Sequence, residues 1–255
     1  MSTLEVITWG AGDAVMLVHG SQADGPATWA HQRPLSERWC LHVVQRRGFG
    51  ASPAADGEDF ERDADDLCRM LEQPTHIVAH SYGAIGALLA ATRRPAAVRS
   101  LTVIEPTCVT AAMDDPEIAK AVEFLADWWL KPPTDPRKFL TEYSALIGVR
   151  AVGLDDGSRG LRDAARRLRS CRPPWTAEVP WDRLAAAQIP MLVVSGGHSP
   201  ALDAVAAAIA RMTGAGHTII RGAGHAVQRA AETFNPKLER HMRSARHQAT
   251  TGQIA

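Results

Sequence analysis

Short, almost continuously apolar segments alternate with helical patterns along most of this 255-residue chain. A run of about four to eight residues rich in Val, Ile and Leu is typical of a strand buried on both faces of a sheet. When such strands alternate with helices, the chain predicts an α/β fold with a mostly parallel, doubly wound sheet and helices on both faces. The predicted strands are Ala14–His19, Leu41–Gln45, His76–His80, Leu101–Ile104, Met191–Ser195 and Thr218–Arg221.

The helices between these strands are predicted from apolar spacing and from start signals. Residues 60–71 repeat apolar side chains at helical spacing, whereas residues 84–91 are apolar all round and predict a buried helix. Ser199–Pro200 and Asn235–Pro236 each combine a capping residue with a proline suited to the first helical position, so we expect helices to begin there. The first apolar segment, Leu4–Trp9, is expected to form an antiparallel edge strand.

The alternation of strands and helices breaks between Glu105 and Ile189, where aromatic residues and prolines concentrate. We therefore interpret residues 1–107 and 186–255 as the core and residues 108–185 as an inserted helical cap. A cap of this kind normally forms one wall of an apolar pocket, which makes Trp128, Trp129 and Tyr143 candidates for contact with a substrate. In the alternative interpretation, the aromatic side chains fill a small core of the insertion itself.

Charge and cysteine content narrow the range of partners. The 28 Lys and Arg residues balance 28 Asp and Glu residues, which argues against a nucleic-acid partner or an anionic membrane surface. The four cysteines form no CxxC or Cys/His cluster, so neither a metal nor a disulfide framework is expected. No apolar run approaches the roughly 18 residues of a membrane span, and no signal peptide is recognisable. We expect a cytoplasmic protein that takes a small-molecule substrate and no cofactor; nothing predicts its oligomeric state.

A serine stands at the junction between the third buried strand and the buried helix, in the segment Ala79-His80-Ser81-Tyr82-Gly83. A serine in such a tight strand-to-helix turn adopts a strained, positive φ, and only small residues fit two positions to either side. The helix that follows directs its positive end at charge that develops on a substrate. With a strand before it and a helix after it, the segment predicts a nucleophile elbow with Ser81 as the nucleophile.

Two further segments end strands at the same predicted edge of the sheet. His19-Gly20-Ser21 closes the first buried strand, and its glycine would let the backbone N–H of Ser21 join that of Tyr82 in a two-donor oxyanion hole. Gly222-Ala223-Gly224-His225 follows the last predicted strand, so His225 is the candidate general base for Ser81.

Together these segments resemble the α/β-hydrolase family, and the resemblance covers essentially the whole chain. Arg46–Ser52 and Pro190–Gly196 match the family as well, the Arg47–Gly48 loop being interpreted as a structural brace. The chain is most similar to small bacterial members with an inserted cap. The resemblance implies the same roles for Ser81 and His225, and oxyanion binding by the backbones of Ser21 and Tyr82.

The sequence departs from the family pattern at the acid that orients the histidine. Family members usually place an Asp in the turn after the strand that ends at Ser195, but here that turn reads Gly197-His198-Ser199-Pro200. Some branches, including certain haloalkane dehalogenases, take the acid from the strand after the elbow helix, which here closes with Glu105. We favour Glu105 over Asp203, because an acidic residue in the first turn of a helix is already explained by the helix dipole. In a third interpretation His225 works without an acid.

The function predicted from these features is that of a serine hydrolase of the carboxylic ester type. It would cleave a small, largely apolar ester, thioester or lactone through an acyl-enzyme on Ser81. One alternative keeps the fold and uses His225 as the base of a cofactor-free dioxygenase or lyase. The other is a ligand-binding protein on a decayed hydrolase scaffold.

Overall fold

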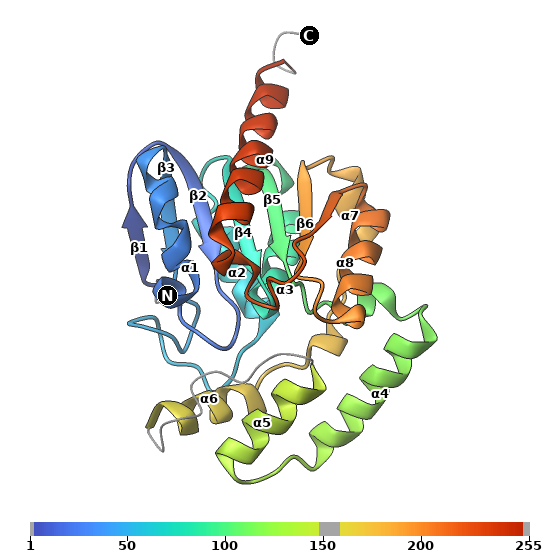
Figure 1. Ribbon diagram of the computed structural model, residues 1–255. Helices are drawn as coiled ribbons and strands as arrows, with labels where there is room; N and C mark the ends of the chain where they lie inside the picture. The colour runs from blue at the N-terminus through green and yellow to red at the C-terminus, as the bar shows by residue number, and fades with distance from the viewer. Residues whose placement is uncertain (1–2, 148–158, 252–255) are drawn as a thin grey trace.

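A single sheet of seven strands runs through the part of the chain that the structure describes, residues 3–147 and 159–251 (Figure 1). The structure is a computed structural model, and its strand order is β1-β3-β2-β4-β5-β6-β7. β1 pairs with β3 in antiparallel orientation at the edge, and every other neighbouring pair is parallel, so the predicted sheet is confirmed. The strands are β1 (Val6–Trp9), β2 (Asp13–Val18), β3 (Trp39–Val44), β4 (Thr75–His80), β5 (Val98–Ile104), β6 (Met191–Ser195) and β7 (Gly216–Ile219).

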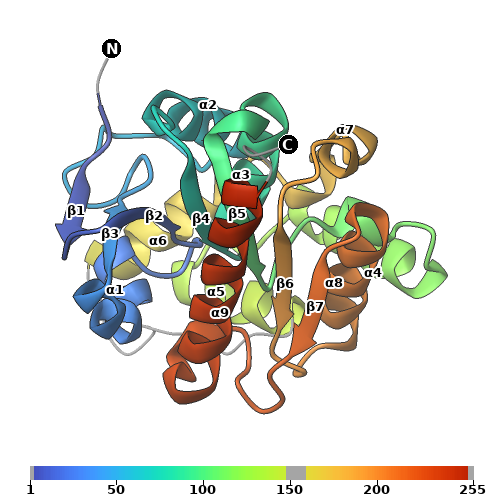
Figure 2. The ribbon, with the colours of Figure 1, turned by 90° about the horizontal axis from the view of Figure 1, so that it is seen from above.

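Helices cover both faces of this sheet (Figure 2). α2, α3 and α8 pack on one face, and α1 and α9 pack on the other. The α-helices are α1 (Gly25–Trp29), α2 (Phe60–Met70), α3 (Tyr82–Arg93), α4 (Pro116–Leu130), α5 (Pro136–Leu146), α6 (Arg159–Arg169), α7 (Trp181–Ala186), α8 (Pro200–Thr213) and α9 (Ala231–Thr251). Short 3-10 segments are η1 (Ala30–Glu37), η2 (Pro95–Ala97), η3 (Val109–Ala112), η4 (Pro174–Thr176) and η5 (Val227–Arg229).

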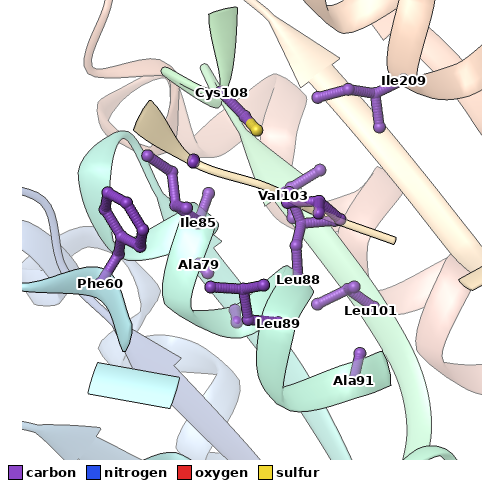
Figure 3. Packing of buried hydrophobic residues seen from close by; sticks show 14 of the residues in the cluster. Phe60, Ala79, Ile85, Leu88, Leu89, Ala91, Leu101, Val103, Cys108 and Ile209 are labelled. Atoms are coloured by element: carbon purple, nitrogen blue, oxygen red, sulfur yellow. The ribbon is translucent and has the colours of Figure 1, made fainter. Parts of the chain in front are cut away.

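Successive strand residues point to opposite faces, which divides the core into two layers. In β4, Ile77 and Ala79 join the layer under α2, α3 and α8, whereas Val78 joins the layer under α9. α3 is buried on every side because it lies between the sheet and α2. A Cβ at Gly86 would come within 2.8 Å of the Asp63 side chain of α2, so this crossing requires glycine. Figure 3 shows Ile85 and Leu88 of α3 among the apolar side chains of this layer.

α4, α5 and α6 lie together beyond one end of the sheet (Figure 1). They enclose a third apolar cluster of their own, formed by Phe139, Leu140, Tyr143, Leu161, Ala165 and Leu168. α7 contacts α3 and α8 instead. The helices α4 to α6 thus have a core of their own, while α7, the last helix within residues 108–185, packs with the helices that cover the sheet.

The last helix begins earlier than its start signal predicted. Asn235–Pro236 was expected to open it, but α9 starts at Ala231 and contains Pro236 within its second turn. Phe234, Leu238 and Met242, four residues apart, are fully buried against the sheet. Burial of Phe234 in this stripe favours helix before the proline and offsets the hydrogen bond that the proline cannot donate. None of the helices in the described ranges has the length and apolar character that crossing a membrane requires.

Candidate active site

Ser81 occupies the tight turn between β4 and α3, with φ 54° and ψ −126°. Its N–H donates to the carbonyl of Ile104, which ties the turn to β5. A Cβ on Gly83 would lie 2.2 Å from the carbonyl oxygen of His19, and one on Gly20 would lie 2.9 Å from the Cβ of Ser81. The end of β2 therefore lies directly against the turn, and both positions require glycine. The turn also lies where the sheet order reverses, between β2 and β4, a common location for ligand sites in α/β folds.

Ser81, His225 and Glu105 form one hydrogen-bonded row, although they come from distant parts of the chain. The Ser81 Oγ lies 2.9 Å from Nε2 of His225, and Nδ1 of His225 lies 3.1 Å from Oε2 of Glu105. Glu105 is fully buried and Ser81 is nearly so. With a proton on Nδ1 donated to the carboxylate, Nε2 is free to accept the proton of the hydroxyl.

The surroundings of this row determine the protonation of its members. Burial, assisted by the neighbouring His198, lowers the pKa of His225, so its imidazole is neutral near pH 7 and can act as a base. Burial raises the pKa of Glu105, whereas the N–H of Gly196, which donates to Oε1, opposes this rise. Because two N–H groups donate to it, the Glu105 carboxylate is stabilised in its ionised form. His80 fixes the loop from the other side, its Nε2 lying 2.9 Å from the carbonyl oxygen of His225.

Asp203, the alternative acid, lies in the first turn of α8, where Ser199 caps the helix. No hydrogen bond joins Asp203 to His225, and its buried Oδ1 has no partner among the described residues. Its charge instead contributes to the raised pKa of Glu105. The structure thus brings Glu105, and not Asp203, to the imidazole.

The two amides expected to bind an oxyanion flank Ser81. Ser21 follows the end of β2, and Tyr82 is the first residue of α3; no acceptor for either backbone N–H is found among the described residues. Both side chains are fixed by Glu58, since the Ser21 hydroxyl donates to its carboxylate at 2.8 Å and the Tyr82 hydroxyl to its carbonyl at 3.1 Å.

A buried arginine supports the loop that carries Ser21. Arg46 is 2% exposed, forms ion pairs with Glu58 and Asp63 at 2.8 Å, and donates to the carbonyl of Gly20 at 3.2 Å. The Arg47–Gly48 loop was the expected brace, but Arg47 pairs with Asp66 of α2. Arg46 braces this loop because burial and two carboxylates fix its guanidinium.

Two pockets meet at His225. The first, of about 250 Å³, is lined mostly by apolar side chains from α4, α5 and α8, including Val122, Leu146 and Leu202. The second, of about 280 Å³, contains Ser81 and is lined by more polar residues from the ends of β2 and β4 and from the loop around η5. A substrate at Ser81 can therefore extend into an apolar side and a polar side.

Of the three aromatic candidates for substrate contact, Tyr143 lines the apolar pocket. Trp128 and Trp129 are not among the lining residues of either pocket beside His225; both pack around Phe139 in the cluster enclosed by α4 to α6. Sequence reasoning missed Phe124 and Trp175, which do line the apolar pocket. Trp175 could have been noticed because it follows Pro173-Pro174 near the end of the insertion. The spacing of the aromatic residues along the chain does not show which of their side chains faces a pocket.

His198 stands in the turn where the family usually has its acid. Its Nδ1 lies 3.8 Å from Oε2 of Glu105, and its ring nitrogens have no hydrogen-bond partner among the described residues. His198, Glu105 and His225 each offer a ligand atom within 4.8 Å of the others, so these described residues are the ones that could hold a metal ion. Such binding would compete with the hydrogen-bonded row, because the row uses the His225 imidazole and the Glu105 carboxylate.

Comparisons with known proteins agree with this fold. Pimeloyl-(acyl-carrier protein) methyl ester esterase of Aeromonas hydrophila subsp. hydrophila is 30% identical over 188 residues, which cover 72% of this chain and 68% of the esterase. The 2-(acetamidomethylene)succinate hydrolase of Mesorhizobium japonicum is 29% identical over 225 residues, covering 81% and 78%. A hydrolase from Oleispira antarctica has a similar structure, with a TM-score of 0.68 at 19% identity and coverage of 93% and 94%. The model of the alpha/beta hydrolase family matches residues 15–236, and the chain belongs to this family.

Proposed function

We propose that this protein is a serine hydrolase that cleaves a small, largely apolar carboxylic ester through an acyl-enzyme on Ser81. The observation that carries the proposal is the hydrogen-bonded row, in which Nε2 of His225 lies 2.9 Å from the Ser81 Oγ. This distance suits proton transfer from the hydroxyl to a neutral imidazole. The relatives support the proposal, since they include a methyl ester esterase and a second hydrolase.

In the first half of the reaction, the Ser81 Oγ attacks the ester carbonyl carbon while His225 accepts the hydroxyl proton. The N–H groups of Ser21 and Tyr82 stabilise the oxyanion of the tetrahedral intermediate, and Glu105 stabilises the imidazolium. When the bond to the alcohol oxygen breaks, His225 returns the proton to that oxygen, and the acyl group remains on Ser81.

In the second half, His225 takes a proton from water as the water oxygen attacks the acyl carbon. The second tetrahedral intermediate collapses, the bond to the Ser81 oxygen breaks, and His225 protonates that oxygen. The acid product leaves, and Ser81 and His225 return to their starting states. We infer that residues 108–185 act as a cap whose apolar side chains, such as Tyr143 and Trp175, accept the apolar part of the substrate.

A fluorophosphonate probe, followed by peptide mass spectrometry, tests the proposal directly. One equivalent of probe should label Ser81 in the wild-type protein, and p-nitrophenyl butyrate should be hydrolysed. Ser81→Ala should lose both labelling and turnover, whereas Ser244→Ala, which changes an exposed serine of α9 outside the site, should keep both. A folded wild-type protein that resists the probe, or equal turnover by the wild type and Ser81→Ala, would support the dioxygenase, lyase or binding-protein alternatives instead.

A further inference from the structure

Arg229 is the one charged residue among the described residues that line the polar pocket beside Ser81. Arg229 ends η5, is exposed, and forms no ion pair or side-chain hydrogen bond with the described residues. Among the described residues, no carboxylate lines this pocket, and no charged side chain lines the apolar pocket on the other side of His225. An unpaired guanidinium beside a reactive serine favours a ligand with negative charge.

Gln228, next to Arg229, adds a second polar feature. Gln228 lines the same pocket and is 2% exposed, yet its side-chain amide oxygen has no hydrogen-bond partner among the described residues. An amide at this position presents its oxygen or its NH₂ group according to its rotamer, and the NH₂ group can donate to an anion. Buried polar groups are normally paired, so this amide fits an anionic ligand when its NH₂ group takes the place of the unpaired oxygen.

The positive charge of Arg229 also acts on a neighbouring residue of the pocket wall. After burial and the neighbouring His225, it contributes to the lowered pKa of His80, another residue that lines the pocket. Because the charge of Arg229 influences His80 in the pocket wall, it also attracts an anionic group that binds in the pocket.

We propose that the preferred substrate of this site is an ester with an apolar group on one side of the scissile bond and a carboxylate on the other. The carboxylate pairs with Arg229 and Gln228 in the polar pocket, while the apolar group enters the pocket lined by Val122, Leu146 and Trp175. The inference rests on the proposed ester hydrolysis, but it concerns how the substrate is recognised and can be measured without turnover.

Two matched pairs of substrates test this preference. In each pair the six-carbon apolar arm is the same and a carboxylate is replaced by a neutral amide: hexanoyloxyacetate with hexanoyloxyacetamide, and monohexyl succinate with hexyl succinamate. The wild type should prefer the acid in at least one pair by about tenfold in kcat/KM, since a charge-assisted hydrogen bond exceeds a neutral one by roughly this factor. Arg229→Gln should remove the preference, because kcat/KM should fall more for the acids than for the amides.

Arg221→Gln is the matched control, because Arg221 is an exposed arginine after β7 that lines neither of the two pockets. It should keep the preference for the acid. Equal kcat/KM for acid and amide in the wild type would overturn the inference while leaving ester hydrolysis intact. The inference would also be overturned if Arg229→Gln lowered kcat/KM equally for the acid and the amide of a pair.

Calorimetry on Ser81→Ala measures the same recognition without chemistry. Its Kd for the preferred acid should rise about tenfold when Arg229→Gln is added, and should not change with Arg221→Gln. If Ser81→Ala binds acid and amide equally, or binds neither, the carboxylate subsite is refuted. If it binds the acid selectively and the wild type hydrolyses no ester, the subsite stands and the proposed hydrolysis fails.

Discussion

Glu105 and Ser81 both hold a positive φ, which is rare for residues other than glycine. Their φ values are 48° and 54°, and Gln188 is the third such residue in the described part of the chain. A residue in this region costs on the order of 1–3 kcal/mol and persists only where its surroundings fix it. For Glu105 those surroundings are the N–H of Gly196 and the imidazole of His225. Strained backbone at two members of one hydrogen-bonded row supports the catalytic role proposed for that row.

The role of Glu105 is tested by a substitution that keeps its shape. Glu105→Gln should lower kcat for ester hydrolysis by about ten-thousandfold, because a neutral amide can hold the imidazole in the wrong tautomer. Asp203→Asn should change kcat little, since no hydrogen bond joins Asp203 to His225. Steady-state kinetics on both variants, with circular dichroism to check folding, gives the comparison. A large loss in Asp203→Asn with near-normal activity in Glu105→Gln would transfer the role to Asp203.

Sequence alone identified Ser81 and His225 as candidates: Ser81 stands between a predicted strand and a buried helix with small residues two positions to either side, and His225 follows glycines after the last predicted strand. It narrowed the acid to two residues but could not decide between them, since the decision depends on which strand ends lie next to each other. β5 pairs with β6, and this brings Glu105 beside Gly196. The approach of His198 to Glu105 had no signal in the sequence, because it depends on how the turn after β6 folds back.

The strand-turn-helix element around Ser81 depends on a close contact between two parts of the backbone. The carbonyl of His19 occupies the space that a Cβ on Gly83 would need, at 2.2 Å. The same stretch of chain carries Ser21, so a shift at position 83 also moves one of the proposed oxyanion donors. The fit of α3 against β2 therefore couples the stability of this element to catalysis.

Gly83→Ala should destabilise the protein by about 1–3 kcal/mol, because overpacking displaces backbone that cannot rearrange freely. It should also lower kcat at least about tenfold through the displaced Ser21 amide. Urea unfolding and ester hydrolysis measure the two effects. Gly216→Ala in β7 is the control: its nearest neighbours lie at 3.7 Å, so its unfolding free energy should stay within about 0.5 kcal/mol of the wild type. Wild-type behaviour of Gly83→Ala would show that this contact does not matter.

Helices and strands were predicted best where a single sequence pattern indicates both the secondary structure and which sides of the element are buried. α3 is apolar all round and is buried all round, as expected. The start of α9 was misplaced because the buried Phe234 outweighs the local signal of Pro236. For α4 and α5, helical spacing shows that an apolar face exists but not whether it faces a pocket or a neighbouring helix. Trp128 packs with Phe139 for this reason, although its sequence context resembles that of Tyr143.

On the scale of the whole molecule, folding buries imidazoles in the central strands as well as in the site. His76 lies in β4, is fully buried, and has its Nδ1 2.7 Å from the Ser100 hydroxyl of β5. Burial, with a smaller contribution from Arg99, lowers the pKa of His76 from 6.5 to about 4. The neutral ring fits between the strands, whereas the charged ring would lose its hydration, a cost that the charge of Asp13 offsets only in part.

Protonation of His76 should therefore lower the stability of the protein as the pH falls from 6.5 to about 4. Between pH 6.5 and about 4 the unfolded chain binds a proton at this residue and the folded protein does not. The free energy of unfolding then decreases by up to about 1.4 kcal/mol per pH unit as the pH falls; above pH 6.5 this contribution is complete and constant. Urea unfolding at about pH 7.5, 6.5, 5.5 and 4.5 measures the free energy of unfolding at each pH, and hence its slope with pH.

His76→Gln removes the titrating ring, so its slope below pH 6.5 should be shallower than that of the wild type by about one proton. The other buried titratable groups, such as Asp63 and His80, are common to both proteins and cancel in the difference between the two slopes. His31→Gln removes an exposed imidazole and serves as the matched control, with the wild-type slope expected. Identical slopes for the wild type and His76→Gln would mean that His76 is protonated alike in both states. The closely packed interface of β4 and β5 would then have to accommodate a charged ring, contrary to its burial.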